Sequence, residues 1–267
     1  MGLSVGELRA RAQGSPTVGS RDDGGRCRRG LRRLSPREHR DPPGDWPQGV
    51  PSPAAPGAGV WHRSREPAVS GLRLADIADL RAYERERDGL RRNVIALKKL
   101  RRVSLGPLLS VVLENRTTVR FQVQEMARAE RILDDAKIQA ELDVYNPLIP
   151  APGELSMTLF VELTTEAELR EWLPKLVGIE RHIVVRVGDG AEAVVVRNTV
   201  DPAHASQLTR DEVTASVHYV KVALPPTVAS RVLAESTVLV SDHPQYQHET
   251  ELLPATKASV VADWSAG

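Results

Sequence analysis

The chain has 267 residues, of which 41% are hydrophobic, 27% charged and 4% aromatic, and its formal net charge is +1. This composition is typical of a globular protein with a mainly aliphatic core, and no apolar run approaches the roughly 20 residues of a membrane-spanning helix. The single cysteine, Cys27, excludes an intrachain disulfide and a centre held by several cysteines of one chain, so we expect a reducing, cytoplasmic location.

The first 70 residues differ in composition from the rest of the chain. They contain 12 Arg, no Lys, 7 acidic residues and 20 of the 38 Gly and Pro residues, without apolar periodicity. Such a segment buries too little apolar surface to offset the entropy of ordering it. The sequence therefore predicts a disordered leader over 1–68 and a single globular domain over 69–267. We expect that the natural protein begins near Val69, and the alternative is that the leader is an Arg-rich arm that contacts nucleic-acid phosphates.

Apolar residues at three- and four-residue steps predict helical structure over 74–83 and 90–97, as two helices or as one broken near Gly89. A basic cluster accompanies the second stretch: Arg91, Arg92, Lys98, Lys99, Arg101 and Arg102. A solvated helix face explains this cluster, and cations suit a helix C-terminus. Nucleic-acid binding through 91–102 is the alternative, which ranks last because residues 71–267 contain 24 basic and 28 acidic residues.

Two extended runs, 103–113 and 117–123, are separated by Glu114-Asn115-Arg116, and strict alternation in the second run predicts a β-hairpin. Gly106-Pro107 should bend the first strand, and a helix should follow over 126–140. The polar residues around this hairpin and helix form a candidate pocket or partner surface, with ordinary surface pairing as the alternative. They are Asn115, Arg116, Gln122, Gln124, Glu125 and Arg128.

The remaining elements favour an α+β fold. A Pro-rich loop over 146–153 precedes five expected strands, at 155–163, 183–187, 193–197, 213–224 and 237–240, and three expected helices, at 165–176, 225–234 and 255–263. Thr165 and Glu168 have the spacing of a capping box, and Gly188-Asp189-Gly190 is a hairpin turn. Hairpins outnumber βαβ units, so we expect a mixed or mainly antiparallel sheet with helices packed on it.

Reactive side chains are densest over 242–249, which the sequence predicts to be a loop. His243, His248 and Glu249, with His218 on the preceding strand, are candidate ligands for Fe, Mn or Zn. Alternatively, one of the loop histidines transfers protons beside Asp242 or Glu249. A solvated loop also collects such residues without any function. Since no nucleotide-binding or hydrolase motif occurs, catalytic residues stay unassigned, and a non-enzymatic role is favoured.

Several segments together resemble a bacterial domain-of-unknown-function family, number 3501 (DUF3501), over about 70–262. They are 114–116, 119–126, 128–131, 141–146, 152–156, 217–219 and 242–244. The resemblance implies an accessory role beside rubrerythrin-like proteins or iron–sulfur oxidoreductases of the heterodisulfide-reductase type, in iron-linked redox or peroxide defence. It implies no catalytic residue. We therefore expect an accessory protein that docks on its partner through residues 116–131, with metal binding and nucleic-acid binding as alternatives.

Overall fold

The structure is a computed structural model that describes residues 71–200 and 213–265. The predictions of a disordered leader and of a start near Val69 concern residues outside this range. Within it, no helix has the length and apolarity needed to cross a bilayer. The described part is an α+β structure with two four-stranded sheets, and every strand pair in it is antiparallel. The expected fold class is confirmed, although the strands form two sheets.

The first sheet, sheet A, has the strand order β1-β2-β3-β6, and the second, sheet B, has the order β5-β4-β7-β8. The strands of sheet A are β1 (Arg102–Leu105), β2 (Leu109–Leu113), β3 (Glu154–Val161) and β6 (Val217–Ala223). Those of sheet B are β4 (Ile183–Val187), β5 (Val194–Arg197), β7 (Thr237–His243) and β8 (Tyr246–Glu251). The longer helices are α2 (Leu80–Arg101), α3 (Arg116–Ala129), α4 (Asp135–Tyr145), α5 (Glu166–Lys175) and α8 (Pro254–Ser265). Shorter helical turns are η1 (Leu74–Asp76), η2 (Asn146–Leu148), η3 (Ile179–Arg181), η4 (Gly190–Glu192) and α7 (Pro226–Ala229).

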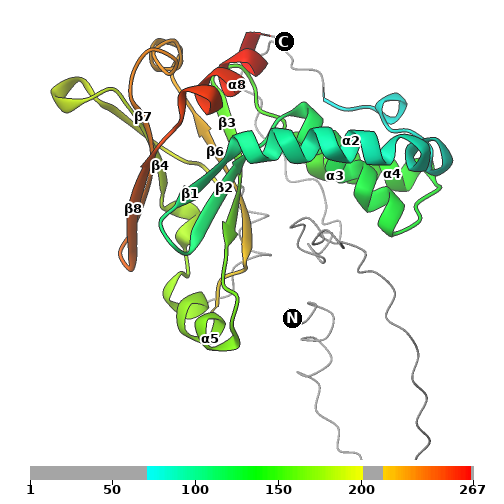
Figure 1. Ribbon diagram of the computed structural model, residues 1–267, viewed down its shortest axis with the longest axis horizontal. Helices are drawn as coiled ribbons and strands as arrows, with labels where there is room; N and C mark the ends of the chain where they lie inside the picture. The colour runs from blue at the N-terminus through cyan, green and yellow to red at the C-terminus, as the bar shows by residue number, and fades with distance from the viewer. Residues whose placement is uncertain (1–70, 201–212, 266–267) are drawn as a thin grey trace, which may run out of the picture. The chain divides into compact units, whose positions relative to one another are not determined.

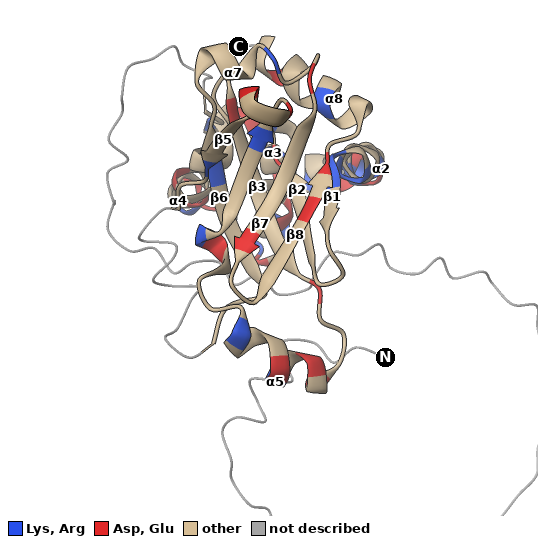
Figure 2. Ribbon diagram, turned by 90° about the vertical axis from the view of Figure 1, so that its left-hand side faces the viewer, with Lys and Arg blue, Asp and Glu red and all other residues tan. Residues whose placement is uncertain are grey.

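The main core lies between the inner faces of the two sheets, where aliphatic residues of both pack together, as Val111 and Leu159 do with Val185 and Leu239. The edges of the sheets also meet. At one edge, the Thr250 hydroxyl in β8 donates a hydrogen bond of 2.7 Å to a backbone carbonyl of β1. At the other, an isolated bridge joins the residues after β5 to β6. The sheets therefore form a nearly closed sandwich, with α5 at one end and α7 and α8 at the other (Figure 2).

A layer of three helices, α2, α3 and α4, lies beside the outer face of sheet A (Figure 1). Its apolar residues form a second core, in which Val119 and Val123 of α3 pack with Leu142 and Tyr145 of α4. Helix α3 packs against both of the other helices. The second core therefore joins α3 to α4, and the polar side chains of α3 lie close to α2 and sheet A.

The predicted hairpin over 103–123 is wrong, because residues 117–123 lie in α3. The Asn115 side chain accepts a hydrogen bond of 3.0 Å from the Thr118 amide, and the Thr118 hydroxyl accepts one of 2.9 Å from the Asn115 amide. This reciprocal cap starts a helix where the sequence suggests a turn. The hairpin instead joins β1 to β2 through Gly106, whose φ of +71° suits glycine.

Other boundaries also differ from the prediction. Helix α2 continues through Gly89 without a break, whereas the predicted helix over 126–140 is two helices. Asp134 caps the second of them through a hydrogen bond of 3.1 Å from the Lys137 amide. The predicted loop over 242–249 is the β7–β8 hairpin. The capping box at Thr165 and the hairpin between β4 and β5 are confirmed.

Candidate functional site

Two of the candidate metal ligands, His218 and His243, are buried histidines on different sheets. His218 lies in β6, where its Nε2 is 2.9 Å from the Thr214 hydroxyl and 2.9 Å from the Ala215 carbonyl. Burial lowers its pKa, although the nearby Glu180 carboxylate opposes this effect. In β7, the Nε2 of His243 is 3.2 Å from a backbone carbonyl, and its Nδ1 accepts a hydrogen bond of 3.2 Å from a backbone amide. Both ring nitrogens of His243 therefore have protein partners.

The other two candidates, His248 and Glu249, lie in β8. His248 packs on the ring of Tyr246 with 4.4 Å between centroids, and Glu249 forms an ion pair of 3.1 Å with Arg186. Among the described residues, no group of three or more His, Cys, Asp or Glu side chains is arranged to hold a metal ion. The structure therefore does not bring the four candidates into one site.

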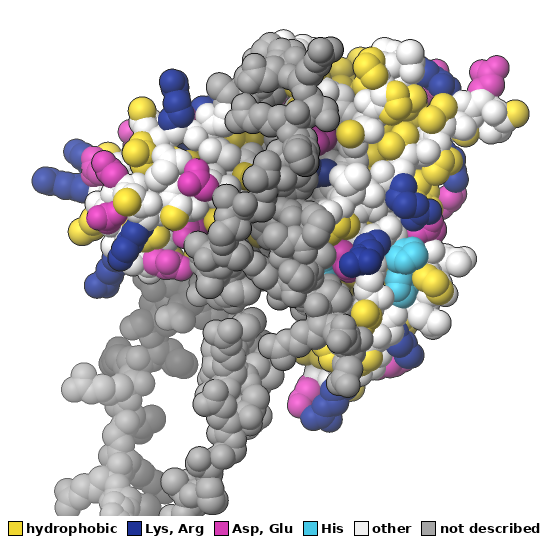
Figure 3. Space-filling view, turned by 180° about the vertical axis from the view of Figure 1, so that it is seen from behind, with side chains coloured by type: hydrophobic (Ala, Val, Ile, Leu, Met, Phe, Trp, Pro, Cys, Tyr) yellow, Lys and Arg dark blue, Asp and Glu magenta, His cyan; other side chains and the backbone are white. Residues whose placement is uncertain are grey.

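Asp242, also in the predicted loop, belongs to a different arrangement. Its carboxylate accepts hydrogen bonds from both terminal nitrogens of Arg197 and lies 3.0 Å from Nδ1 of His182. The bonds from Arg197, together with the weaker one from His182, lower the pKa of Asp242 to about 2. The His182 ring packs edge-on against His243, with 5.0 Å between centroids. In Figure 3 a histidine is exposed on the sheet part of the molecule beside basic side chains.

Most of the candidate pocket or partner residues connect the helices to one another. Arg116 pairs with Asp76 at 3.0 Å. The Gln124 amide donates to the Ala78 carbonyl at 2.8 Å and accepts from the Ala78 amide at 3.0 Å. Asn115 caps α3, as described above. These contacts join α3 to the segment around η1, so the residues are part of the helical layer.

Glu125 and Arg128 lie at the contact between α2 and α3. Glu125 accepts hydrogen bonds from the Tyr83 hydroxyl at 2.6 Å and from Arg87 at 2.8 Å. Burial alone would raise the pKa of Glu125, but these hydrogen bonds outweigh it and lower the pKa. Arg128 pairs with Glu84 at 3.4 Å. The predicted docking surface over 116–131 is therefore largely occupied by contacts within the protein.

Gln122 belongs instead to a buried polar cluster between the helical layer and the outer face of sheet A. This Glu114 cluster consists of Lys98, Glu114, Gln122, Thr158 and Tyr219. The Thr158 hydroxyl donates to Glu114 Oε1 at 2.7 Å, and Lys98 Nζ lies 3.8 Å from the same oxygen. Thr158 and Tyr219 are opposite each other on β3 and β6, and the Gln122 amide donates to the Tyr219 hydroxyl at 3.4 Å.

The electrostatics of the Glu114 cluster are unusual for a protein interior. Glu114 is 3% exposed, and within the described part of the chain its buried Oε2 has no hydrogen-bond partner. The Lys98 side chain is 14% exposed. Burial lowers the pKa of Lys98, although the negative charge of Glu114 acts in the opposite direction. Burial also raises the pKa of Tyr219. The cluster thus combines a buried carboxylate, an amine and a phenol, groups able to bind a polar molecule or to move protons.

Two further buried hydroxyls lie on the same side of sheet A. Ser156 precedes Thr158 by two positions in β3, so both side chains point to the outer face. Its hydroxyl is buried and has no hydrogen-bond partner among the residues that the structure describes. The buried hydroxyl of Tyr145 in the second core has only a weak contact to the Gln122 side chain. Buried polar groups without a partner are uncommon in proteins. Their concentration here distinguishes this interface from the apolar core between the sheets.

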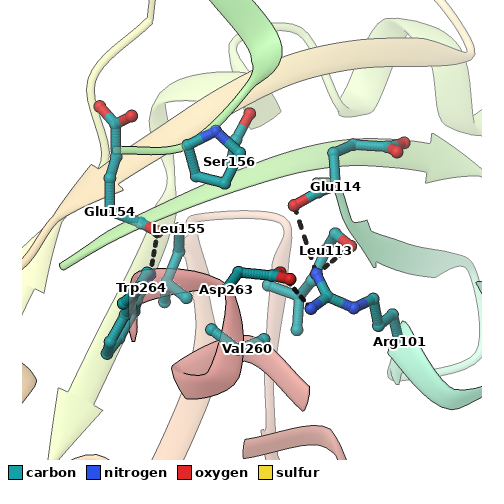
Figure 4. Close-up of a pocket in the computed structure, with 10 residues that line it drawn as sticks. Arg101, Leu113, Glu114, Glu154, Leu155, Ser156, Val260, Asp263 and Trp264 are labelled. Carbon is teal, nitrogen blue, oxygen red and sulfur yellow. Dashed lines mark hydrogen bonds and ion pairs between the residues drawn. The ribbon is translucent and has the colours of Figure 1, made fainter. Parts of the chain in front are cut away.

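A small cavity of about 10 Å³, enough for about one water molecule, adjoins the cluster at the end of β2. Arg101 reaches into it and donates hydrogen bonds to the Leu113 and Glu114 carbonyls and to Asp263 of α8. The Glu114 side chain points away from this cavity (Figure 4). Ligand pockets usually measure about 300–1,000 Å³, and Arg101 already fills this space. The cavity is therefore part of the packing of α8 against α2.

The predicted basic cluster is divided by these contacts. Arg101 is 1% exposed and Lys98 belongs to the Glu114 cluster, while Arg102 pairs with Glu162 at 2.6 Å. On α2, Arg92 and Lys99 remain exposed. Half of the cluster thus has internal partners, which leaves few cations for a continuous phosphate-binding surface.

Of the Glu114 cluster, sequence reasoning identified only Gln122 as a candidate pocket residue. It assigned Glu114 to the break of a hairpin, Lys98 to a solvated helix face, and Thr158 to a strand over 155–163. One signal was present in the sequence: Ser156 and Thr158 alternate with Leu155, Met157 and Leu159, which marks a strand with one polar face. In the structure, that polar face meets the helical layer.

One of the comparisons with known proteins identifies a family. A search of the curated proteins finds no match. The chain is similar to a novel protein of unknown function from Burkholderia pseudomallei K96243, whose crystal structure was determined at 1.90 Å resolution. The two are 35% identical with a TM-score of 0.65, over 73% of this chain and 99% of that chain. Residues 71–264 match the family model described as "Protein of unknown function (DUF3501)", which confirms the resemblance expected over about 70–262, and the chain belongs to this family.

Proposed function

We propose that the protein is an accessory protein that binds a small polar ligand at the Glu114 cluster. One observation carries the proposal: the carboxylate of Glu114 is buried, yet one of its two oxygens has no partner among the described residues. A buried polar group without a partner costs about 1–3 kcal/mol, and more when it is charged. A ligand that donates an N–H or O–H to this oxygen removes that cost.

The distance between Lys98 and Glu114 supports the same proposal. At 3.8 Å the two charges attract each other, but the separation exceeds the 2.7–3.2 Å of an N–H···O hydrogen bond. A small molecule that donates to Glu114 Oε2 supplies a hydrogen bond that Lys98 does not. The ligand should therefore carry an N–H or O–H donor, with the Lys98 amine and the phenol of Tyr219 as further contacts.

The family resemblance supplies the context of the accessory role. It supports a cytoplasmic protein that serves a rubrerythrin-like protein or an iron–sulfur oxidoreductase in iron-linked redox chemistry or peroxide defence. Affinity purification of the protein from its native host tests this part of the proposal. Recovery of such a partner supports it, and repeated recovery of the protein without any redox protein contradicts it.

The binding site is tested by thermal unfolding of the full chain with glycerol, glycolate, glycine, ethanolamine or glycolaldehyde. A ligand at 100 times its Kd adds about 2.7 kcal/mol to the free energy of unfolding, which raises Tm. At least one probe should raise the Tm of the wild type and of the control Glu162→Gln, whose carboxylate is 48% exposed. The same probe should leave Glu114→Gln unchanged. If no probe raises Tm, or if Glu114→Gln responds like the wild type, the proposal is wrong.

Elemental analysis separates this proposal from metal binding. The alternative assigns Fe, Mn or Zn to His218, His243, His248 and Glu249, residues that lie apart as described above. The ligand proposal expects the purified protein, made without a histidine tag, to contain less than one metal ion per chain. Stoichiometric metal that is lost in His243→Ala and in His248→Ala would favour the metal-binding alternative.

A further inference from the structure

We propose that Lys98 is a nucleophile that forms an imine with a small hydroxyaldehyde, and that Glu114 moves the protons of this reaction. The inference rests on the proposed function, because it places the ligand in the Glu114 cluster. It goes further by naming the chemical class of the ligand and a covalent step. The juxtaposition that carries it is a mostly buried primary amine 3.8 Å from a buried carboxylate with an unpartnered oxygen.

Lys98 has the surroundings of a reactive lysine. It lies near the end of α2, with its side chain 14% exposed and directed toward the outer face of sheet A, where Glu114 and Thr158 are buried. An amine is nucleophilic only when it is neutral, and removal from water favours the neutral form. The lowered pKa of Lys98 follows from this burial. Its neighbour Lys99 is exposed on the same helix and lacks these surroundings.

Glu114 is placed to carry the protons in both directions. Its carboxylate first takes a proton from the Lys98 ammonium, and the resulting amine attacks the carbonyl carbon of the aldehyde. A proton moves from nitrogen to oxygen to give a neutral carbinolamine. The protonated Glu114 then returns its proton to the carbinolamine hydroxyl, which leaves as water while the C=N bond forms. The products are a protonated imine, water and the Glu114 carboxylate, so no external oxidant or reductant is needed.

The unpartnered oxygen of Glu114 selects the ligand. While Oε1 accepts a hydrogen bond from Thr158, Oε2 has none from the described residues. A hydroxyl on the carbon next to the carbonyl reaches this oxygen when the carbonyl carbon is bound to Lys98, because only two bonds separate the carbonyl carbon from the hydroxyl oxygen. An aldehyde without the hydroxyl leaves Oε2 unsatisfied, at a cost of about 1–3 kcal/mol. The cluster should therefore prefer a hydroxyaldehyde to an alkyl aldehyde of the same size.

The test is reductive trapping on the full chain followed by peptide mapping. The protein is treated with glycolaldehyde or with propionaldehyde, which has a methyl group in place of the hydroxyl, in the presence of cyanoborohydride. Glycolaldehyde should label Lys98 on the order of 100-fold faster than Lys99, the lower end of the factor that a positioned acid–base group contributes. The ratio of the Lys98 rate to the Lys99 rate should be smaller with propionaldehyde and close to one in Glu114→Gln. In the control Glu162→Gln the ratio should equal that of the wild type.

Two outcomes would overturn the inference. If Lys98 is labelled no faster than Lys99, Lys98 is not a reactive amine. If the ratio of the two labelling rates is the same with both aldehydes, the hydroxyl of the ligand has no role. Circular dichroism of Glu114→Gln ensures that its result does not come from unfolding. If a probe raises the Tm of the wild type while Lys98 carries no adduct, the ligand-binding proposal is supported and the imine proposal is wrong. If no probe raises Tm and Lys98 carries no adduct, both proposals are wrong.

Discussion

The hydroxyl of Tyr246 provides a sharp test of how the two sheets close on each other. Tyr246 begins β8 of sheet B, and its hydroxyl donates to the Leu105 carbonyl at 2.8 Å and accepts from the Leu108 amide at 2.9 Å. Leu105 is the last residue of β1, and Leu108 lies in the turn that leads to β2 of sheet A. Replacing Tyr246 by Phe removes one oxygen and leaves two backbone groups without their partner.

The expected loss follows from the burial of these groups. Leu105 is fully buried and Tyr246 is 3% exposed, so water cannot easily replace the missing hydroxyl. An unsatisfied buried donor or acceptor costs about 1–3 kcal/mol, and Leu108 is partly accessible, so we expect Tyr246→Phe to lose about 2–4 kcal/mol of unfolding free energy. With a urea dependence of about 2–3 kcal/mol/M, the unfolding midpoint should fall by about 1 M.

Tyr145→Phe is the matched control, measured by the same urea unfolding. Tyr145 is 1% exposed, and its hydroxyl forms no hydrogen bond of normal geometry within the described residues, with only a weak contact to the Gln122 side chain. Removing it should change the unfolding free energy by less than about 0.5 kcal/mol, or stabilise the protein slightly. If the two variants lose the same stability, the hydroxyl of Tyr246 does not join the sheets and this account of their closure is wrong.

Three further predictions concern stability. Arg101→Met should lose about 3–5 kcal/mol in urea unfolding, because it breaks a buried charged network, whereas Arg92→Met on the exposed side of α2 should be nearly neutral. Gly106→Ala should be destabilising in the same assay, since its φ is +71° and an added Cβ would lie 2.5 Å from the Tyr246 hydroxyl. The pKa of Asp242 is lowered to about 2 from 3.8, so the stability it contributes should be present above pH 4 and be lost as the pH falls toward 2.

Each of these predictions has an outcome that contradicts it. Equal losses in Arg101→Met and Arg92→Met would mean that the buried guanidinium is not a structural centre. A Gly106→Ala variant as stable as the wild type would mean that the turn adapts to a side chain. For Asp242, the difference in urea midpoint between the wild type and Asp242→Asn should decrease from pH 7 to pH 2.5. A constant difference over that range would exclude the ionised carboxylate as its source.

The parts of the fold that the sequence predicted are those with local signals. The capping box at Thr165 and the hairpin at Gly188-Asp189-Gly190 each depend on residues close together in the chain, and both are present. Residues 114–123 were misassigned because their signal fits two structures. Asn115 starts a turn or caps a helix equally well, and the burial of α3 on several sides hides its helical period. Contacts with α2, α4 and sheet A decide between them.

Strand β8 and the Glu114 cluster could not be predicted from local sequence, because both depend on contacts between distant segments. In β8 only Tyr246 is buried, and the exposed Gln247, His248 and Glu249 give no strand alternation, so pairing with β7 forms the strand. The residues of the Glu114 cluster come from α2, the end of β2, α3, β3 and β6. Their proximity depends on how the helical layer packs on sheet A. Family membership, in contrast, followed from short segments of sequence and was confirmed.

The surroundings of Glu114 argue that its burial has a purpose beyond packing. Its amide donates to the Ser156 carbonyl at 2.8 Å, and its carbonyl accepts from Arg101, which is held in turn by α8. The next residue, Asn115, caps α3. The backbone of Glu114 is thus fixed by β3, α2, α8 and α3, while one oxygen of its carboxylate has no partner in the described structure. Binding sites are typically built this way, with a rigid support behind a side chain whose hydrogen bonds the ligand completes. A carboxylate buried only by the accident of packing would be cheaper to replace by an apolar residue.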